Sequence, residues 1–224
     1  MIIRPIYLKT LRKYRDIPLV KILAGIRRCG KSTILEMLKN DLMESGVSES
    51  NIISVRYTAE TLNRSMTAQE MFDEIKSQMS GQGKYDLLLD EVQEVTGWEK
   101  AVNTLLEDMN VDIYVTGSNS KLMSGEISTY LTGRYISIPV YTLSFAEYME
   151  FHKDSEFTKN ELLNEYIRKG GFPIVALGNF DDHSSYQIVE GIYTSVVTND
   201  IARRHNITNQ ESVSYTHLRA HETL

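Results

Sequence analysis

A nine-residue segment, GIRRCGKST at residues 25–33, constrains this chain more than any other part of its sequence. It follows the apolar run at residues 22–24 and precedes a segment with the apolar spacing of a helix. The pattern G-x-x-x-x-G-K-[ST] at a strand-to-helix junction is typical of a phosphate-binding loop, whose backbone N–H groups point at phosphate oxygens. We therefore expect an α/β fold with an anion site at the start of that helix.

The residues of this loop have different expected roles. Lys31 is expected to reach the β- and γ-phosphates of a nucleotide, and Ser32 is expected to coordinate Mg²⁺. Arg27, Arg28 and Cys29 occupy the variable positions, so we expect them to be exposed or to contact a partner. A basic surface turn is the alternative interpretation of the motif. The residues predicted to hold the nucleotide are Gly25, Ile26, Arg27, Arg28, Cys29, Gly30, Lys31, Ser32 and Thr33.

Short apolar runs alternate with helical periodicity in the first part of the chain, which predicts a parallel sheet with crossover helices. The expected helices cover residues 31–43 and 98–109. After Pro139 the pattern becomes helical, and the KGGFP segment separates two of three amphipathic helices. We therefore expect a sheet domain at residues 1–142 and a helical domain at residues 143–211. The expected strands are 19–24, 51–57, 85–89, 111–116 and 135–140, and the expected later helices are 145–151, 161–169 and 186–201.

The last segment, SVSYTHLRAHETL at residues 212–224, differs in character from the rest of the chain. It has neither apolar periodicity nor turn chemistry, and it resembles a translated sequencing adaptor. We expect the natural protein to continue past Glu211, and a frayed native terminus is the alternative. The segment is therefore left out of the fold prediction.

Two adjacent carboxylates follow the apolar run in YDLLLDEVQEV at residues 85–95. Asp90 is expected to hold Mg²⁺, and Glu91 is expected to polarise the water that attacks the γ-phosphorus. The alternative is an acidic strand end that faces solvent. An extra strand is predicted between the phosphate-loop strand and this one, which marks the division of phosphate-loop proteins that carries its own catalytic glutamate.

Two further segments supply polar side chains next to expected strands. VTGSNSKL ends an apolar strand in small polar residues, and Asn119 or Ser118 is the candidate to contact the γ-phosphate and the attacking water. Alone this signal is weak, because Gly, Ser and Asn also form ordinary turns. LTGRY places Arg134 just before the last strand, where an arginine is usually a solvated edge residue.

The charge and the cysteine content narrow the classes of partner and compartment. A net charge of −6 gives no general attraction to nucleic acid or to an anionic membrane surface. The single cysteine excludes a disulfide framework within the chain. We expect a cytoplasmic protein, because the sequence shows neither a signal peptide nor an apolar run of membrane-spanning length.

Six segments in order, GIRRCGKST, LLLDEVQ with GWEKAVNTLL, TGSNSKL, LTGRY, PVYTLSFAEY and GGFP, resemble AAA+ ATPases that are often fused to an uncharacterised C-terminal domain in bacteria and archaea. The resemblance covers residues 1 to about 211. It implies strand order 5-1-4-3-2 followed by a helical lid, with Asn119 as the first sensor. It also implies that Arg134 acts in trans on the ATP of a neighbouring copy, and that the family's second domain is missing from this chain.

The expected activity is Mg²⁺-dependent hydrolysis of ATP to ADP and phosphate, which drives a conformational change in a partner or in the C-terminal domain. Lys31, Glu91, Asn119 and Arg134 are the expected catalytic residues. A slow nucleotide-dependent switch is the alternative function. A small-molecule phosphotransferase is disfavoured, because Glu91 points to water as the nucleophile.

Overall fold

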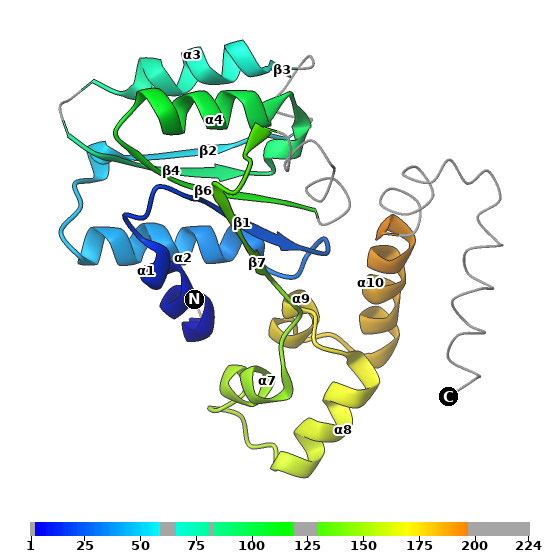
Figure 1. Cartoon of the computed structure of the whole chain (residues 1–224). Helices are drawn as coiled ribbons and strands as arrows, with labels where there is room; N and C mark the ends of the chain where they lie inside the picture. The colour runs from blue at the N-terminus through cyan, green and yellow to red at the C-terminus, as the bar shows by residue number, and fades with distance from the viewer. Residues whose placement is uncertain (1–2, 59–65, 81–82, 119–129, 197–224) are drawn as a thin grey trace. The chain divides into compact units, whose positions relative to one another are not determined.

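The computed structural model describes residues 3–58, 66–80, 83–118 and 130–196 (Figure 1). It divides into two units. The first comprises residues 1–25 and 30–140 and contains the sheet. The second comprises residues 26–29 and the chain from residue 141 onward. Each unit is described separately below.

The first unit is built on a five-stranded parallel sheet in the order β2-β4-β6-β1-β7. Numbered among themselves in chain order, these strands read 2-3-4-1-5, which is the expected 5-1-4-3-2 counted from the opposite edge. Two short strands, β3 (Met66–Thr67) and β5 (Val95–Thr96), form a second sheet that the sequence pattern did not predict. The five strands of the main sheet are β1 (Val20–Gly25), β2 (Ile52–Arg56), β4 (Tyr85–Asp90), β6 (Val111–Ser118) and β7 (Tyr135–Pro139).

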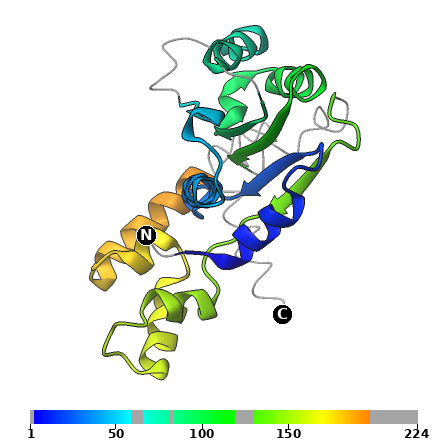
Figure 2. The ribbon, with the colours of Figure 1, turned by 90° about the vertical axis from the view of Figure 1, so that its left-hand side faces the viewer.

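Helices cover both faces of the main sheet (Figures 1 and 2). α1 (Pro5–Tyr14) and α2 (Lys31–Glu44) lie on one face, and α3 (Ala68–Gln78) and α4 (Trp98–Asp108) lie on the other. Every residue of β1 and β4 is therefore buried, as is usual for strands of a parallel sheet. The core on the α4 side includes Val20, Ile22, Leu87, Leu89, Ile113, Val115, Trp98, Val102 and Leu105.

Two helices of this unit, α1 and α3, were not among the elements expected from the sequence. α1 begins with Pro5 in its first turn and buries only Tyr7, Leu8 and Leu11. α3 begins with a capping box between Thr67 and Glu70, and it buries only two residues. Two single-turn 3₁₀ helices, η1 (Glu49–Asn51) and η2 (Val92–Glu94), complete the unit.

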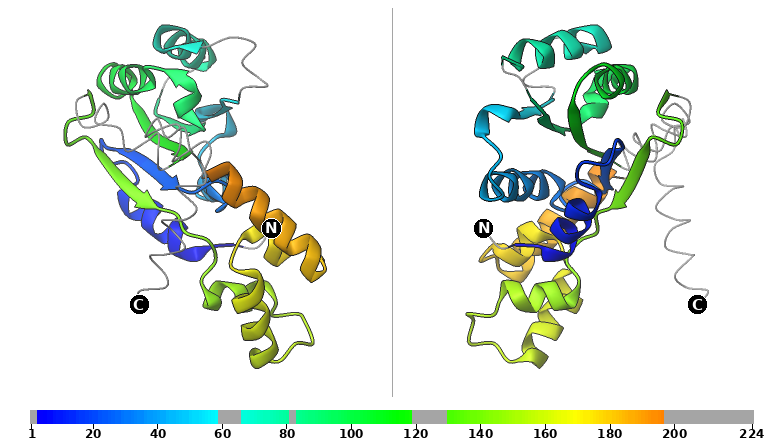
Figure 3. Two further views of the ribbon diagram at one scale, coloured as in Figure 1. Left: turned by 90° about the vertical axis from the view of Figure 1, so that its right-hand side faces the viewer. Right: turned by 60° about the vertical axis from the view of Figure 1, so that its left-hand side comes forward.

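Among its described residues, the second unit has four helices, drawn from yellow-green to orange in Figure 3: α7 (Phe145–Phe151), α8 (Lys159–Lys169), α9 (Pro173–Leu177) and α10 (Asp182–Ser195). Leu143, Tyr148, Leu162 and Ala176 form its core. Gly170 ends α8 as predicted, and Pro173 opens α9, a short helix that was not among the expected elements.

Two helix starts in this unit differ from the prediction. α8 begins two residues before the expected 161, because Thr158 and Glu161 form a capping box. α10 begins at Asp182 rather than 186, since Asp181 caps it. Capping residues are polar, so apolar periodicity cannot detect them. Residues 197–201 of the expected last helix, and the tail at 212–224, lie outside the described residues.

Within the described ranges, no helix combines the length and apolar character that spanning a bilayer requires.

Candidate functional site

The site lies at the carboxyl ends of three neighbouring strands in the sheet unit. Gly25 ends β1, Asp90 ends β4 and Ser118 ends β6. The register places Gly25 beside Ser118 and Leu89 beside Val115. Residues far apart in the sequence therefore meet at this edge, where parallel α/β sheets bind ligands.

The phosphate loop leads from β1 directly into α2. Gly30, the N-cap of α2, has φ +101°, a left-handed conformation that glycine adopts without steric cost. A glycine cap has no side chain to hydrogen-bond the first-turn N–H groups, so these groups remain available to an anion. The Lys31 ammonium is buried and donates to the Gly25 carbonyl at 3.0 Å. Lys31 thus folds back over the base of the loop.

The middle of the loop differs in part from the prediction. Ile26 and Arg28 are exposed and Arg27 is half-buried, but Cys29 is fully buried. The expectation that Cys29 is an exposed loop residue is therefore wrong. Its N–H donates to the Ile26 carbonyl at 3.4 Å and closes a turn, and a free thiol is buried at little cost because it behaves as a small apolar group.

The carboxylate of Asp90 has partners on both of its oxygens. The Ser32 hydroxyl donates to Oδ1 at 3.1 Å, and the Thr116 hydroxyl donates to the same oxygen. The Arg56 Nε lies 3.3 Å from Oδ2. Asp90 is nearly buried, so this carboxylate is held in one place between the phosphate loop, β2 and β6.

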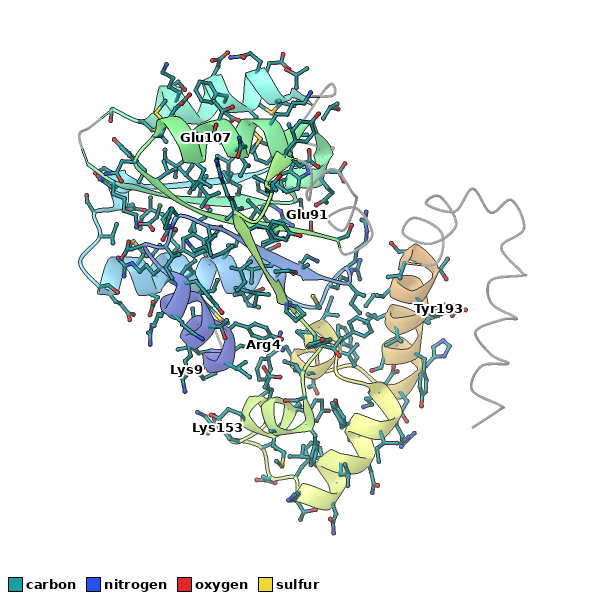
Figure 4. The ribbon with its side chains drawn as sticks, in the orientation of Figure 1. Arg4, Lys9, Glu91, Glu107, Lys153 and Tyr193 are labelled. Atoms are coloured by element: carbon teal, nitrogen blue, oxygen red, sulfur yellow. The ribbon has the colours of Figure 1, made fainter. Side chains whose placement is uncertain are left out.

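Glu91 follows Asp90 in an unusual backbone conformation. Its φ of +58° and ψ of 42° lie in the left-handed region, which is uncommon for a residue with a side chain. Such strain persists where surrounding contacts enforce it, commonly at functional sites. The Glu91 N–H donates to the Thr116 hydroxyl at 3.0 Å, and its carboxylate accepts from the Gln93 amide. Figure 4 labels Glu91 beyond the end of β4.

Three residues of this arrangement were not singled out from the sequence. Thr116 is fully buried and connects Asp90 to the backbone of Glu91. Arg56 and Gln93 contact the two carboxylates. The sequence does offer a signal for Thr116, because it is a small hydroxyl residue that directly follows the apolar part of β6. The sequence offers no such signal for Arg56 or Gln93. The contact of Arg56 depends on strand register, and that of Gln93 depends on the geometry of the turn after β4.

The oxygens present suit Mg²⁺ and a phosphate. The Ser32 hydroxyl and the Asp90 carboxylate are hard oxygen ligands already within 3.1 Å of each other, a donor set that Mg²⁺ prefers. The Ser118 hydroxyl is buried and has no hydrogen-bond partner among the described residues. A buried hydroxyl of this kind is suited to a bound phosphate oxygen or water.

A cavity of about 340 Å³ borders the Asp90 carboxylate. Its size is at the lower end of small-molecule sites, which are on the order of 300–1,000 Å³. Ser32 and Asp90 therefore face open space on one side. The cavity is lined by Ser32, Thr33, Leu35, Glu36, Ser54, Val55, Arg56 and Asp90.

Arg134 does not belong to the site of its own chain. It follows a turn at Gly133 and precedes β7, and its carbonyl accepts from the Val20 N–H at 2.8 Å. Val20 begins β1, so Arg134 lies at the amino end of the sheet, roughly 17 Å along the strand from Gly25. Its guanidinium forms an ion pair with Glu107 of α4, labelled in Figure 4.

The structure thus brings together Gly25, Lys31, Ser32, Asp90 and Glu91, as the motifs predicted. Asn119, the preferred candidate for the first sensor, lies outside the described residues. Ser118, the alternative, is in place at the end of β6.

Several known proteins are similar to this chain in sequence. The family model described as AAA domain matches residues 18–149, more than half of the chain. An uncharacterized protein of Haemophilus influenzae is 38% identical over 207 residues, which is 91% of this chain and 51% of the relative. An uncharacterized protein of Methanocaldococcus jannaschii is 30% identical over 203 residues, which is 87% of this chain and 44% of the relative. The chain spans about half the length of these curated relatives.

A solved structure shares the fold. The match to the DNA polymerase III gamma subunit-related protein of Thermotoga maritima has a TM-score of 0.53 at 14% identity, and it covers 85% of this chain and 62% of that one. The family match at residues 18–149 includes the phosphate loop, β4 and the turn before β7. The chain therefore belongs to the AAA domain family, the AAA+ ATP-binding proteins that its ordered motifs resemble.

Proposed function

We propose that this chain binds ATP with Mg²⁺ and hydrolyses the ATP to ADP and phosphate. The observation that carries the proposal is the hydrogen-bonded chain from Ser32 through Asp90 and Thr116 to the backbone of Glu91. It joins the phosphate loop to a carboxylate suited to activating water, at one edge of one sheet. Family membership supports nucleotide binding.

Each residue has a separate task in the proposed reaction. Lys31 and the first-turn N–H groups of α2 hold the phosphates, and Ser32 and Asp90 hold the metal. Mg²⁺, when bound, neutralises charge on the phosphate oxygens. Glu91 accepts the proton of the attacking water. Asn119 or Ser118 contacts the γ-phosphate or that water.

Replacing the proposed base tests the reaction directly. We expect Glu91→Gln to bind ATP as tightly as the unmodified protein but to release phosphate about 10²- to 10⁴-fold more slowly, the usual contribution of a general base. Nucleotide binding and steady-state phosphate release are measured on both proteins. Glu94→Gln is the matched control, since it neutralises a neighbouring carboxylate. Unchanged turnover in Glu91→Gln refutes the assigned base.

We further propose that Arg134 completes the site of a second copy of this chain. Its position at the amino end of the sheet keeps it away from its own phosphate loop, and its half-exposed side chain can reach a partner. An arginine supplied in trans accelerates such reactions by about 10³- to 10⁵-fold, so an isolated copy turns over slowly.

A dilution series tests the second copy. Turnover per chain is expected to rise with protein concentration, and Arg134→Ala is expected to remove this rise while nucleotide binding persists. Arg168→Ala, which removes another exposed arginine with an acidic partner, is the control. Turnover per chain that stays constant on dilution contradicts the proposal.

A nucleotide-dependent switch is the second candidate. The Gln93 amide occupies one oxygen of the Glu91 carboxylate, which disfavours fast proton abstraction at that oxygen. In this version ATP binding changes the conformation of a partner or of a C-terminal domain, and hydrolysis resets it. Slow nucleotide release in single-turnover experiments, accelerated by a partner, favours the switch over a continuously cycling ATPase.

A further inference from the structure

Strand register, rather than chance contact, places Arg56 beside the proposed metal ligand. Arg56 ends β2 and Asp90 ends β4, and the two residues are paired in the parallel ladder. The Arg56 Nε lies 3.3 Å from Asp90 Oδ2, the oxygen that neither hydroxyl uses. A cation of the protein therefore sits on the carboxylate to which we assign Mg²⁺.

The two partners of this ion pair differ in how firmly they are held. The Asp90 side chain is 9% exposed and accepts two hydroxyl hydrogen bonds, whereas the Arg56 side chain is 65% exposed. Arg56 also lines the cavity of about 340 Å³ beside the site. The arginine can therefore move away into open space while the carboxylate stays in place.

We propose that Arg56 competes with the divalent cation for Asp90 and thereby sets the metal affinity of the site, an inference that rests on the proposed function. Two cations on one carboxylate repel each other, and Asp90 supplies only one negative charge to share. A metal bound at Oδ1, beside Ser32, weakens the Arg56 contact at Oδ2 by this repulsion. Arg56 thus makes the site select for a cation delivered together with nucleotide phosphates, whose negative charge offsets this repulsion.

A phosphate-binding role for Arg56 makes a different prediction about metal and nucleotide affinity. If Arg56 instead held the nucleotide phosphates, its removal would weaken nucleotide binding and would not strengthen metal binding. Metal affinity and nucleotide affinity must therefore be measured separately. Mn²⁺ is a suitable probe, because its electron paramagnetic resonance signal reports the free and bound ion without any catalytic turnover.

The experiment titrates Mn²⁺ into the protein saturated with the non-hydrolysable analogue AMPPCP. We expect Arg56→Gln to lower the Kd for Mn²⁺ by about threefold to fivefold, the scale of a solvent-exposed ion pair. Arg56→Lys keeps the charge and is expected to stay within about twofold of the unmodified protein. Arg12→Gln, which removes an arginine from Asp41 elsewhere in the sheet unit, is expected to change nothing.

The outcomes separate this inference from the proposed function. Unchanged or weaker Mn²⁺ binding by Arg56→Gln, with folding confirmed by thermal unfolding, overturns the inference alone. Weaker AMPPCP binding by the same variant assigns Arg56 to the phosphates and also overturns it. Failure of the unmodified protein to bind AMPPCP and Mn²⁺ contradicts the proposed function as well.

Discussion

The two ends of the central sheet both carry charged side chains, but only one end is closed. At the amino end, the buried Lys21 ammonium pairs with Asp112 of β6. Asp112 also accepts from the Tyr114 hydroxyl at 2.8 Å and from the Asp16 N–H at 2.9 Å. Lys84 approaches Asp112 at 3.4 Å. These charged groups are therefore paired with one another within the unit.

At the carboxyl end, the partners are fewer and one side is open. Asp90 is held by two hydroxyls and an exposed arginine, and a cavity lies beside it. Glu91 is kept in a strained backbone conformation, and the Ser118 hydroxyl has no partner among the described residues. Strain and an unsatisfied oxygen also occur at the amino end, at Asp16 and Asp86, so the cavity beside Asp90 is what marks the carboxyl end as a site kept ready for a ligand.

The comparison therefore separates two uses of similar residues. At the amino end, the charged side chains hold β1, β4 and β6 together. At the carboxyl end, the charged side chains are positioned to bind a ligand. Substitutions at the first end should lower stability, and substitutions at the second end should lower activity.

Lys21→Met should have the largest effect. It leaves the nearly inaccessible Asp112 carboxylate without its main counter-charge, and breaking a buried pair in this way costs about 3–5 kcal/mol. Urea denaturation measures the loss in the free energy of unfolding. Lys39→Met is the control, because it removes a partly exposed pair with Glu49 and should cost at most about 1 kcal/mol. Equal losses in the two variants contradict a structural role for the amino end.

Lys31→Met tests the other end with a matched lysine. Loss of one preorganised positive charge at the phosphates should lower phosphate release by about 10²- to 10³-fold. The free energy of unfolding should stay within about 1 kcal/mol, the scale of the hydrogen bond to the Gly25 carbonyl that the substitution removes. Both quantities are measured on the same preparation. A stability loss as large as that of Lys21→Met means that the two ends do not differ.

Thr116→Val is expected to lower both the stability of the fold and its turnover. The substitution keeps the shape but removes the hydroxyl that serves Asp90 and the Glu91 N–H. Two buried groups lose a partner, so the free energy of unfolding should fall by about 1–3 kcal/mol. Turnover should fall as well, because the strained conformation of Glu91 loses support. Thr116→Ser keeps the hydroxyl and should retain more stability and turnover than Thr116→Val; losses in Thr116→Ser as large as those in Thr116→Val contradict the role of the hydroxyl.

Sequence patterns predicted the five main strands and the loop because their physical signals are local. β1 and β4 are buried on both faces, so they read as largely apolar runs, with Lys21 and Asp86 as exceptions near their starts, and the phosphate loop needs its glycines and lysine at fixed spacing. α1 and α3 were not predicted, although α8, which buries only Leu162, was. The number of buried residues therefore does not explain which helices the pattern revealed, and propensity alone is a weak guide to a short helix.

The candidate site was predictable as a list of ligands but not as a network. Asp90 and Glu91 followed from the motif. The contacts of Thr116, Arg56 and Gln93 depend on which strands are neighbours and in what register, and no single stretch of sequence encodes that. The burial of Cys29 is a second example, since a variable loop position carries no signal of the fold around it.

Asp86→Asn should have the smallest effect, and pH should control it. Asp86 is the second residue of the buried strand β4, at its amino end, and its Oδ1 has no hydrogen-bond partner among the described residues, although the Lys84 ammonium lies 3.9 Å away. Burial raises the pKa of this carboxyl. The folded state therefore binds the proton more tightly than the unfolded state does. As the pH rises from the unfolded value, about 3.9, through the raised folded pKa, ionisation lowers the stability of the fold.

Because the side-chain amide of Asn is neutral, Asp86→Asn removes the cost of burying a charge at every pH at which Asp86 is ionised. At pH 7 Asp86→Asn should raise the free energy of unfolding by up to about 1 kcal/mol, the scale of one buried hydrogen bond. Near pH 3 the carboxyl is protonated in both states, so the two proteins should be equally stable. Urea denaturation across this pH range measures the difference. A destabilised variant at pH 7 means that attraction between Asp86 and Lys84 outweighs the cost of burial, and that the amino end is closed more completely than its hydrogen bonds indicate.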